Sequence, residues 1–300
     1  MLAIETERPS PRYSGIDLWD PSDVLEAMIE GQFSAVAAVR AARPAIERAA
    51  LAMEGRLKDS GRLVYAGAGT SGRLAVQDGA ELMPTFSWPP ERLVLLIAGG
   101  EQALTRAVEG AEDDLKRARA LIKKHKVGAA DVLIAVAASG ATPFTLACLR
   151  EAKKKGALTI GIANNARTPL LAEAHHPILL ETGSEPIAGS TRMKAGTAQR
   201  ITLSLLSSLL MIRLGRVYDG MMVDVQPTNR KLAQRSEAIL MHLTGRKAKD
   251  VRAALDRAKG SIKLAVLLLK GCELDEARRL LARAKGRLRA AIAELGKRDR

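Results

Sequence analysis

The stretch Leu63-Val-Tyr-Ala-Gly-Ala-Gly-Thr-Ser-Gly-Arg73 decides how the rest of the chain is interpreted. Its first four residues are apolar and too few for a helix, which predicts a short buried strand. The glycine-rich turn that follows leads into a helical pattern from about Ser71. Glycines let backbone N–H groups approach an anion, and a helix N-terminus adds about half a positive charge. The stretch therefore predicts an anion-binding turn between a strand and a helix.

Three ligands compete for this turn, beside the alternative of an ordinary strand-to-helix connection. The spacing matches G-x-G-x-x-G, but a dinucleotide site also needs an acid at the end of the next strand. The first acid after the expected strand 93–98 is Glu101, which follows two further glycines. A P-loop needs Gly-Lys followed by Ser or Thr, whereas this turn has Gly72-Arg73. Thr70 and Ser71 place two hydroxyl groups beside the glycines, which favours a phosphomonoester.

Length and composition narrow the class of protein. The chain has 300 residues, enough for one large α/β domain and a smaller one. It has no uncharged apolar run of about 18 residues, which predicts no membrane span. The start of the sequence lacks the pattern of a secretion signal, and its two cysteines have neither disulfide nor metal spacing. These features predict a cytoplasmic protein.

The net charge of +14 raises the possibility of nucleic-acid binding. Residues 227–300 hold 20 Lys or Arg against 8 Asp or Glu, so +12 of the excess lies in the last quarter of the chain. That segment contains no Phe, Tyr or Trp to stack on bases. A solvated, Arg-rich helical surface is the better interpretation, and we expect no nucleic-acid partner.

The chain before the first strand reads as a polar arm over residues 1–20 followed by helices. Asp20 and Pro21 have the residue types of an N-cap and a first helical position. Helical periodicity then continues towards Leu57, but Pro44 lies inside it, which predicts a kink or a break near Arg43. We expect these helices to pack on the sheet or on another subunit.

The middle of the chain alternates between strands and helices, which is typical of a doubly wound α/β domain with a parallel five-stranded sheet. The expected strands are 62–67, 93–98, 131–137, 157–163 and 177–180, and the expected helices lie near 71–82, 101–125, 142–155 and 168–173. In such sheets ligands bind outside the carboxyl ends of the strands. A second hydroxyl-rich loop, with Ser139 and Thr142, follows the third strand. Two such loops at one sheet edge predict a sugar phosphate between them.

A third anion-friendly corner follows the last strand of this sheet. Ser190 or Thr191 is expected to cap a long helix that runs to about Leu214, with Arg192 and Lys194 in its first turn. The alternative is a capped helix whose first turn happens to be basic. The rest of the chain is expected to form short helices at 228–243, 246–258, 261–270, 274–284 and 286–295. We therefore divide the chain into an N-terminal part (1–57), a ligand-binding domain (58–226) and a helical C-terminal module (227–300).

Two carboxylates are candidates for chemistry, although each would more often be an ordinary surface acid. Glu81 lies just before the proline that is expected to end the helix begun at Ser71, and Glu112 lies in the expected helix after the second strand. Ten residues of helix span about 15 Å, too far for Glu81 to touch a sugar whose phosphate sits at Ser71. Either that helix bends or Glu81 serves a site completed by a second subunit, and we prefer the second. None of the four histidines lies in a ligand loop, so proton transfer would fall to carboxylates.

These motifs closely resemble one family, the N-acetylmuramic acid 6-phosphate etherases, which have the sugar isomerase (SIS) fold. The resemblance covers about residues 5–291 and is carried by Gly67-Ala-Gly-Thr-Ser-Gly-Arg73, Ala98-Gly-Gly-Glu101, Val108-Glu-Gly-Ala-Glu-Asp113, Ala138-Ser-Gly-Ala-Thr-Pro143, Gly189-Ser-Thr-Arg-Met-Lys-Ala-Gly-Thr-Ala-Gln199, Met222-Val-Asp-Val225 and Thr228-Asn229. The chain departs from the family in its N-terminal arm, in Asp78-Gly-Ala-Glu81 and in its basic C-terminus.

The resemblance implies a flavodoxin-like SIS domain in a cytoplasmic, cofactor-free and metal-free lyase of peptidoglycan recycling. Such an enzyme removes the D-lactyl ether by elimination and hydration, giving N-acetylglucosamine 6-phosphate and D-lactate. It also implies that Glu81 protonates the departing lactate and that Glu112 removes the C2 proton. By the same resemblance, the phosphate and sugar are held by Thr70, Ser71, Glu109, Ser139, Thr142 and Ser190, and we add Thr191 and Lys194 from the basic corner.

One alternative function has different consequences. Glucokinase regulatory proteins share several of these motifs, so the chain could be a sugar-phosphate sensor that acts on a protein partner. The presence of both Glu81 and Glu112 argues against a sensor, which needs no acid and base. We expect a homodimer whose sites are shared between subunits.

Overall fold

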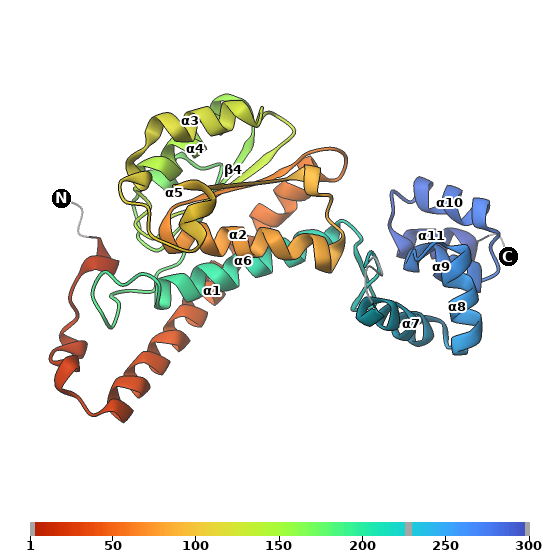
Figure 1. Cartoon of the computed structure of the whole chain (residues 1–300), viewed down its shortest axis with the longest axis horizontal. Helices are drawn as coiled ribbons and strands as arrows, with labels where there is room; N and C mark the ends of the chain where they lie inside the picture. Colours follow the sequence, from red (N-terminus) through yellow and green to blue (C-terminus); the bar gives the residue numbers. More distant parts are fainter. Residues whose placement is uncertain (1–3, 226–229, 298–300) are drawn as a thin grey trace. The chain divides into compact units, whose positions relative to one another are not determined.

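The computed structural model describes residues 4–225 and 230–297 (Figure 1). Its first part comprises η1 (Glu5–Glu7), η2 (Pro11–Tyr13), η3 (Ile16–Leu18), α1 (Pro21–Leu57), β1 (Leu63–Gly67), α2 (Gly69–Phe86), η4 (Pro90–Arg92), β2 (Leu93–Ile97), η5 (Gly100–Leu104), η6 (Ala111–Asp113), α3 (Leu115–Lys124), β3 (Val132–Val136), α4 (Pro143–Lys154), β4 (Leu158–Ala163), α5 (Pro169–Glu173), β5 (His176–Leu179) and α6 (Lys194–Arg213). It continues with β6 (Val217–Tyr218), β7 (Met221–Met222), α7 (Arg230–Thr244), α8 (Ala248–Arg257), α9 (Ile262–Leu269), α10 (Leu274–Arg283) and α11 (Leu288–Leu295). Thr228, Asn229 and the expected domain boundary at 226/227 lie outside the described residues.

The sheet confirms the predicted doubly wound architecture. Its five strands are parallel in the order β2-β1-β3-β4-β5. From β1 the chain first adds β2 on one side and then adds β3, β4 and β5 on the other, so the switch point of the sheet lies between β1 and β3. Helices α3, α4 and α5 cover one face, and α1, α2 and α6 lie on the other (Figure 1). Strands β1, β3 and β4 are buried throughout because both of their faces are covered.

Helix α1 continues through Pro44, so, of the kink or break predicted near Arg43, the break does not occur. Proline removes one helical hydrogen bond and costs about 3 kcal/mol in a helix interior. The turns that follow Pro44 bury Ile46, Ala49, Ala50 and Met53, the last three with no exposed surface. Burial of about 1.5–3 kcal/mol per large apolar side chain offsets that cost.

The single helix predicted for residues 101–125 is also wrong. Two short 3₁₀ helices, η5 and η6, replace its first half, because Gly99, Gly100 and Gly110 adopt positive φ and interrupt any helix. The α3 helix begins only at Leu115, where the Asp114 side chain accepts a hydrogen bond of 2.8 Å from the Arg117 backbone N–H. Residues 105–110 therefore form a loop at the carboxyl edge of the sheet, and η6 follows it directly. In a smaller correction, Pro84 lies inside α2 and does not end it.

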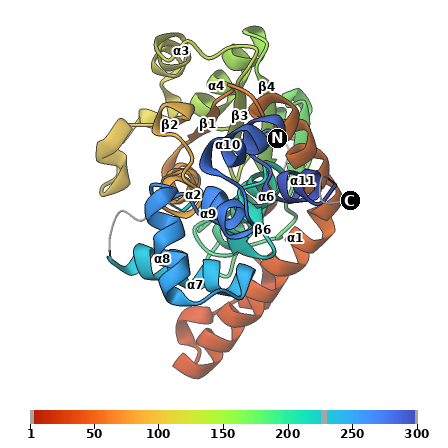
Figure 2. The ribbon, with the colours of Figure 1, turned by 90° about the vertical axis from the view of Figure 1, so that its right-hand side faces the viewer.

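The chain packs into two compact units. The first contains the sheet and comprises residues 1–80 and 90–207, and the second comprises residues 81–89 and 208–300. Within the second unit, β6 and β7 pair antiparallel and α7 to α11 close a core of their own (Figure 2). The five predicted C-terminal helices are found within two residues of their expected bounds wherever those bounds are described. The three-part division of the chain stays a prediction.

A buried lysine and a partly buried arginine tie the second unit together. Lys263 Nζ donates a hydrogen bond of 2.7 Å to Asp224 Oδ2, and Arg216 Nη1 lies 3.7 Å from the same oxygen. Arg216 also donates to the carbonyl oxygens of Phe86 and Ser87, at 2.7 and 3.1 Å, and so caps the end of α2. None of the described helices has the length and apolar character that crossing a bilayer requires.

Candidate active site

The turn after β1 is built on a close approach of backbone to backbone. A Cβ atom at Gly67 would lie 2.8 Å from Gly72 Cα, and one at Gly72 would lie 2.8 Å from the Gly67 carbonyl carbon. Only glycine at both positions lets α2 start directly against the end of β1. Thr70 and Ser71 therefore stand in the first turn of α2, where backbone N–H groups have no helical acceptor.

The loop after β3 presents a second pair of hydroxyl groups. The Ser139 and Thr142 hydroxyl oxygens lie 3.3 Å apart, and the Ala141 backbone N–H donates to Ser139 Oγ at 3.2 Å. Gly140 has φ +65°, and a Cβ atom there would lie 2.2 Å from Thr168 Oγ1. The loop thus requires glycine, and it delivers both hydroxyls to the N-terminus of α4.

One pocket of about 390 Å³ lies between these two loops, at the position where the topology predicts a ligand. It is lined by Ile4, Glu7, Ala68, Gly69, Thr70, Ser71, Glu112, Asp113, Ala138, Ser139, Ala141, Thr142, Pro143 and Thr191. Six of the residues singled out from the sequence therefore come together: Thr70, Ser71, Glu112, Ser139, Thr142 and Thr191. The volume of the pocket and the hydroxyl groups that line it suit a ligand of the size of a sugar phosphate.

The electrostatics of the pocket are unusual for an anion site. Glu7, Glu112 and Asp113 contribute three carboxylates, while the described lining residues include no Lys, Arg or His. A bound phosphate would be held by the hydroxyl groups and by the N–H groups at the starts of α2 and α4. Over residues 4–225 and 230–297, the His, Cys, Asp and Glu side chains form no group of three or more that could hold a metal ion.

The sequence predicts Ser190 or Thr191 as the N-cap of α6, but neither residue caps this helix. The helix starts later, at Lys194, and the buried Glu185 carboxylate accepts hydrogen bonds from the Lys194 and Ala195 backbone N–H groups at 3.0 and 2.9 Å. Burial raises the pKa of Glu185, although these two bonds and the Lys194 charge act in the opposite direction. Sequence reasoning missed Glu185 because it lies nine residues before the helix it caps.

The remaining predicted residues lie outside the pocket. Lys194 is buried, its side chain rests against Gly31 of α1, and burial lowers its pKa. Glu109 joins Glu112 in a neighbouring cavity of about 250 Å³ that shares Ala68 and Gly69 with the pocket. Ser190 is half-buried in the turn before α6.

Glu81 is exposed and does not line the pocket. It lies ten residues along α2 from Ser71, and α2 runs on as a helix to Phe86. About 15 Å of helix therefore separates the two residues. The helix is uninterrupted between these two residues.

The N-terminal arm contributes the residues that sequence reasoning missed. Ile4 and Glu7 both line the pocket, although residues 1–20 read only as a polar arm. The signal available was Glu7 itself, an acid within that arm. Its place in the fold could not be inferred, because the arm joins the sheet through contacts with residues more than 150 positions away.

The fold and the pocket define a class: an α/β protein of the SIS group with a polar ligand site at the switch point of its sheet. Residues 45–153 match the family model of the glucokinase regulatory protein N-terminal SIS domain, and residues 107–209 match that of the SIS domain.

Comparison with curated proteins narrows this class to one family. The N-acetylmuramic acid 6-phosphate etherase of Deinococcus radiodurans is 52% identical over 88% of this chain and 87% of its own length. The etherase of Halalkalibacterium halodurans is 41% identical over 97% and 98%, and that of Cutibacterium acnes is 42% identical over 97% and 92%. The chain belongs to the N-acetylmuramic acid 6-phosphate etherase family.

Proposed function

We propose that the protein is a cytoplasmic lyase that converts N-acetylmuramic acid 6-phosphate and water into N-acetylglucosamine 6-phosphate and D-lactate. The family membership supports this reaction. The observation that carries the proposal is the pocket that Glu112 lines together with the hydroxyl-bearing loops after β1 and β3. It offers a phosphate cradle and a carboxylate base in one cavity.

The elimination requires one general base and one general acid. In the open-chain sugar the C1 aldehyde acidifies the C2 proton, and Glu112 takes that proton. The C3–O bond then breaks, lactate leaves with a proton from Glu81, and a C2–C3 double bond forms. Water then adds its hydroxyl to C3 and gives its proton to the Glu81 carboxylate, while Glu112 returns a proton to C2, which completes the hydration. Thr70, Ser71, Ser139, Thr142 and Thr191 hold the phosphate and sugar, with Glu109 beside the ring in the neighbouring cavity.

The reaction is tested by NMR in D2O with purified protein and N-acetylmuramic acid 6-phosphate. We expect free D-lactate and deuterium at C2 of the product. Glu112→Gln should suppress both lactate release and C2 exchange by about 10²–10⁴-fold, the usual contribution of a general base. Glu81→Gln should slow lactate release while C2 exchange of the substrate continues.

A matched control comes from Glu101, an acid in η5 that does not line either cavity. Glu101→Gln should keep the wild-type rate. Substrate that binds but stays intact, with no C2 exchange, would contradict the proposed reaction. A sugar-phosphate sensor of the regulatory-protein type would then replace it.

We also propose a homodimer in which Glu81 of one subunit serves the pocket of the other. The separation of Glu81 from Ser71 along α2 supports a shared site. An apolar stripe on α1 offers a surface for the second copy, since four side chains at helical spacing are 50–70% exposed: Leu25, Ile29, Phe33 and Val36.

Mixing inactive variants tests the shared site directly. Glu81→Gln and Glu112→Gln subunits, unfolded together and refolded, should form mixed dimers in about half of the cases. Each mixed dimer has one pocket with both carboxylates intact, so about a quarter of the wild-type activity should return. If both carboxylates of a site came from one chain, mixing would restore nothing. Sedimentation of Phe33→Glu should show a monomer if the α1 stripe is the interface.

A further inference from the structure

The N-terminal arm is fastened to the carboxyl edge of the sheet. Thr6 is completely buried: its backbone N–H donates to Asn165 Oδ1 at 3.3 Å, and Asn165 Nδ2 donates to Thr6 Oγ1 at 3.0 Å. The same Asn165 amide donates to the Ala138 carbonyl oxygen at 2.8 Å. The arm is thereby fixed beside the loop that carries Ser139, one residue further along the chain.

The arm is also fastened from the other side. The Gly189 backbone N–H donates to the Thr6 carbonyl oxygen at 3.0 Å, and the Ser184 hydroxyl donates to Glu5 Oε1 at 3.3 Å. Glu5 and Thr6 thus hold the short helix η1, and the next residue, Glu7, is free to face the pocket. A Cβ atom at Gly189 would lie 2.6 Å from Glu7 Oε2, so the carboxylate rests against the backbone there.

We propose that Glu7 is a sugar-positioning residue, whose carboxylate accepts hydrogen bonds from hydroxyl or amide N–H donors of the bound amino sugar. The inference rests on the proposed function for the identity of the ligand. Glu7 lines the same cavity as the phosphate-binding hydroxyls of Thr70 and Ser139. A carboxylate repels the phosphate and attracts the donor groups of the sugar, so it selects the orientation that turns the phosphate towards α2 and α4.

This role predicts opposite effects on two ligands. Glu7→Gln keeps the shape of the side chain but removes its charge, and charged hydrogen bonds are roughly twice as strong as neutral ones. Binding of N-acetylglucosamine 6-phosphate, the proposed product, should weaken by about tenfold. Binding of inorganic phosphate should be unchanged or tighter, because a repelling charge has been removed. Both affinities are measured by calorimetry on the full-length protein.

A matched control is Glu5→Gln, two residues away in the same short helix. Glu5 bonds to Ser184 and does not line the pocket, so this variant should bind both ligands as the wild type does. In turnover assays Glu7→Gln should raise KM for N-acetylmuramic acid 6-phosphate more than it lowers kcat. Circular dichroism should show equal folding of all three proteins.

Three outcomes would overturn the inference. Equal weakening of both ligands by Glu7→Gln would mean that Glu7 only holds the arm. Wild-type affinity for both would mean that Glu7 does not contact the sugar, and a wild-type protein that binds no N-acetylglucosamine 6-phosphate would leave it nothing to position. A wild-type protein that binds the sugar phosphate but releases no lactate would refute the lyase proposal alone, and the comparison of the two ligands would still decide the role of Glu7.

Discussion

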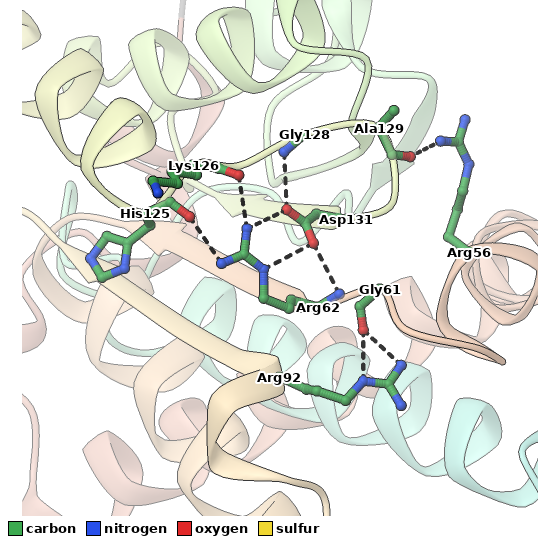
Figure 3. A network of polar contacts seen from close by, with 9 residues as sticks. All are labelled: Arg56, Gly61, Arg62, Arg92, His125, Lys126, Gly128, Ala129 and Asp131. Carbon is green, nitrogen blue, oxygen red and sulfur yellow. Dashed lines mark hydrogen bonds and ion pairs between the residues drawn. The ribbon is translucent and has the colours of Figure 1, made fainter.

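Replacement of Asp131 by asparagine should destabilise the sheet from the edge opposite the pocket. Asp131 precedes β3, and its carboxylate accepts four hydrogen bonds (Figure 3): from the Arg62 backbone N–H at 3.0 Å, Arg62 Nε at 3.1 Å, Arg62 Nη2 at 2.7 Å and the Gly128 backbone N–H at 3.0 Å. The Arg62 guanidinium also donates to the His125 and Lys126 carbonyl oxygens. The network joins the segments that enter β1 and β3.

The expected loss in the free energy of unfolding is about 3 kcal/mol. Asparagine has one acceptor oxygen in place of two, so about half of the four bonds are lost, each worth roughly 1.5–3 kcal/mol when one partner is charged. The N–H groups of the asparagine amide would also face the N–H donors of Arg62, and two donors cannot form a hydrogen bond. The Asp131 side chain is 6% exposed and that of Arg62 26%, so solvent screens the pair little. The value falls at the lower end of the range for breaking a buried ion pair, about 3–5 kcal/mol.

Urea denaturation followed by far-UV circular dichroism measures this loss as a function of pH. Burial acts to raise the pKa of Asp131, but the hydrogen bonds from Arg62 and Gly128 outweigh it and lower the pKa below its usual value of 3.8. A lowered pKa contributes stability above the unfolded value and loses it as the pH falls through the folded value. The difference in unfolding free energy between wild type and variant should therefore be full at neutral pH and narrow as the pH falls from about 3.8 through the lower folded pKa.

Catalysis provides the control for this prediction. Because the network lies at the amino edge of the sheet, the folded Asp131→Asn protein should keep the wild-type KM. The double variant Arg62→Met/Asp131→Asn should lose less stability than the sum of the two single changes. A difference in unfolding free energy between wild type and Asp131→Asn of under about 1 kcal/mol, or one that persists unchanged at pH 3, would refute the assignment of this stability to the ion pair.

Three further predictions concern other parts of the fold. Gly140→Ala should lower the melting temperature, at a cost of about 2 kcal/mol, and weaken phosphate binding measured by calorimetry, because its Cβ would lie 2.2 Å from Thr168 Oγ1 at positive φ. Glu185→Gln should change the pH dependence of the melting temperature: the raised pKa of Glu185 means that the wild type loses stability as the pH rises from about 4.5 through the folded value, and the variant should lack that loss. Lys263→Met should destabilise the C-terminal unit by about 3 kcal/mol in thermal unfolding, because Asp224 loses a buried partner at 2.7 Å; a change under 1 kcal/mol would mean that Arg216 alone satisfies Asp224.

The sequence determined much of this fold because the relevant patterns are local. Each strand of the sheet is a short apolar run followed by a turn, and the order of strands and helices is enough to place the ends of β1 and β3 at one edge. The hydroxyl groups of Thr70, Ser71, Ser139 and Thr142 could therefore be assigned to one pocket without coordinates. The five C-terminal helices were equally accessible, since glycine-containing turns separate them.

The errors arise where distant contacts override local preference. Pro44 should interrupt α1, but burial of the following turns keeps the helix intact. Glu185 caps α6 across nine residues of irregular chain, so no cap pattern reveals it. Glu7 enters the pocket only because Thr6 is bound by Asn165, 159 residues away. A single sequence contains each of these residues but not the pairing that gives it a role.

The lack of cations among the described lining residues has a chemical consequence for Glu112. A carboxylate that is paired with Arg or Lys has a lowered pKa and is a weaker base. Over residues 4–225 and 230–297, Glu112 forms no ion pair, whereas Asp131 at the other edge of the sheet is fully engaged by Arg62. In the proposed mechanism the phosphate is held by hydroxyl and backbone N–H groups, and the described lining of the pocket adds no side-chain cation beside Glu112. Introducing one, as in Ser139→Lys, should therefore tighten phosphate binding and at the same time lower kcat, because a cation paired with the proposed base weakens it as a proton acceptor.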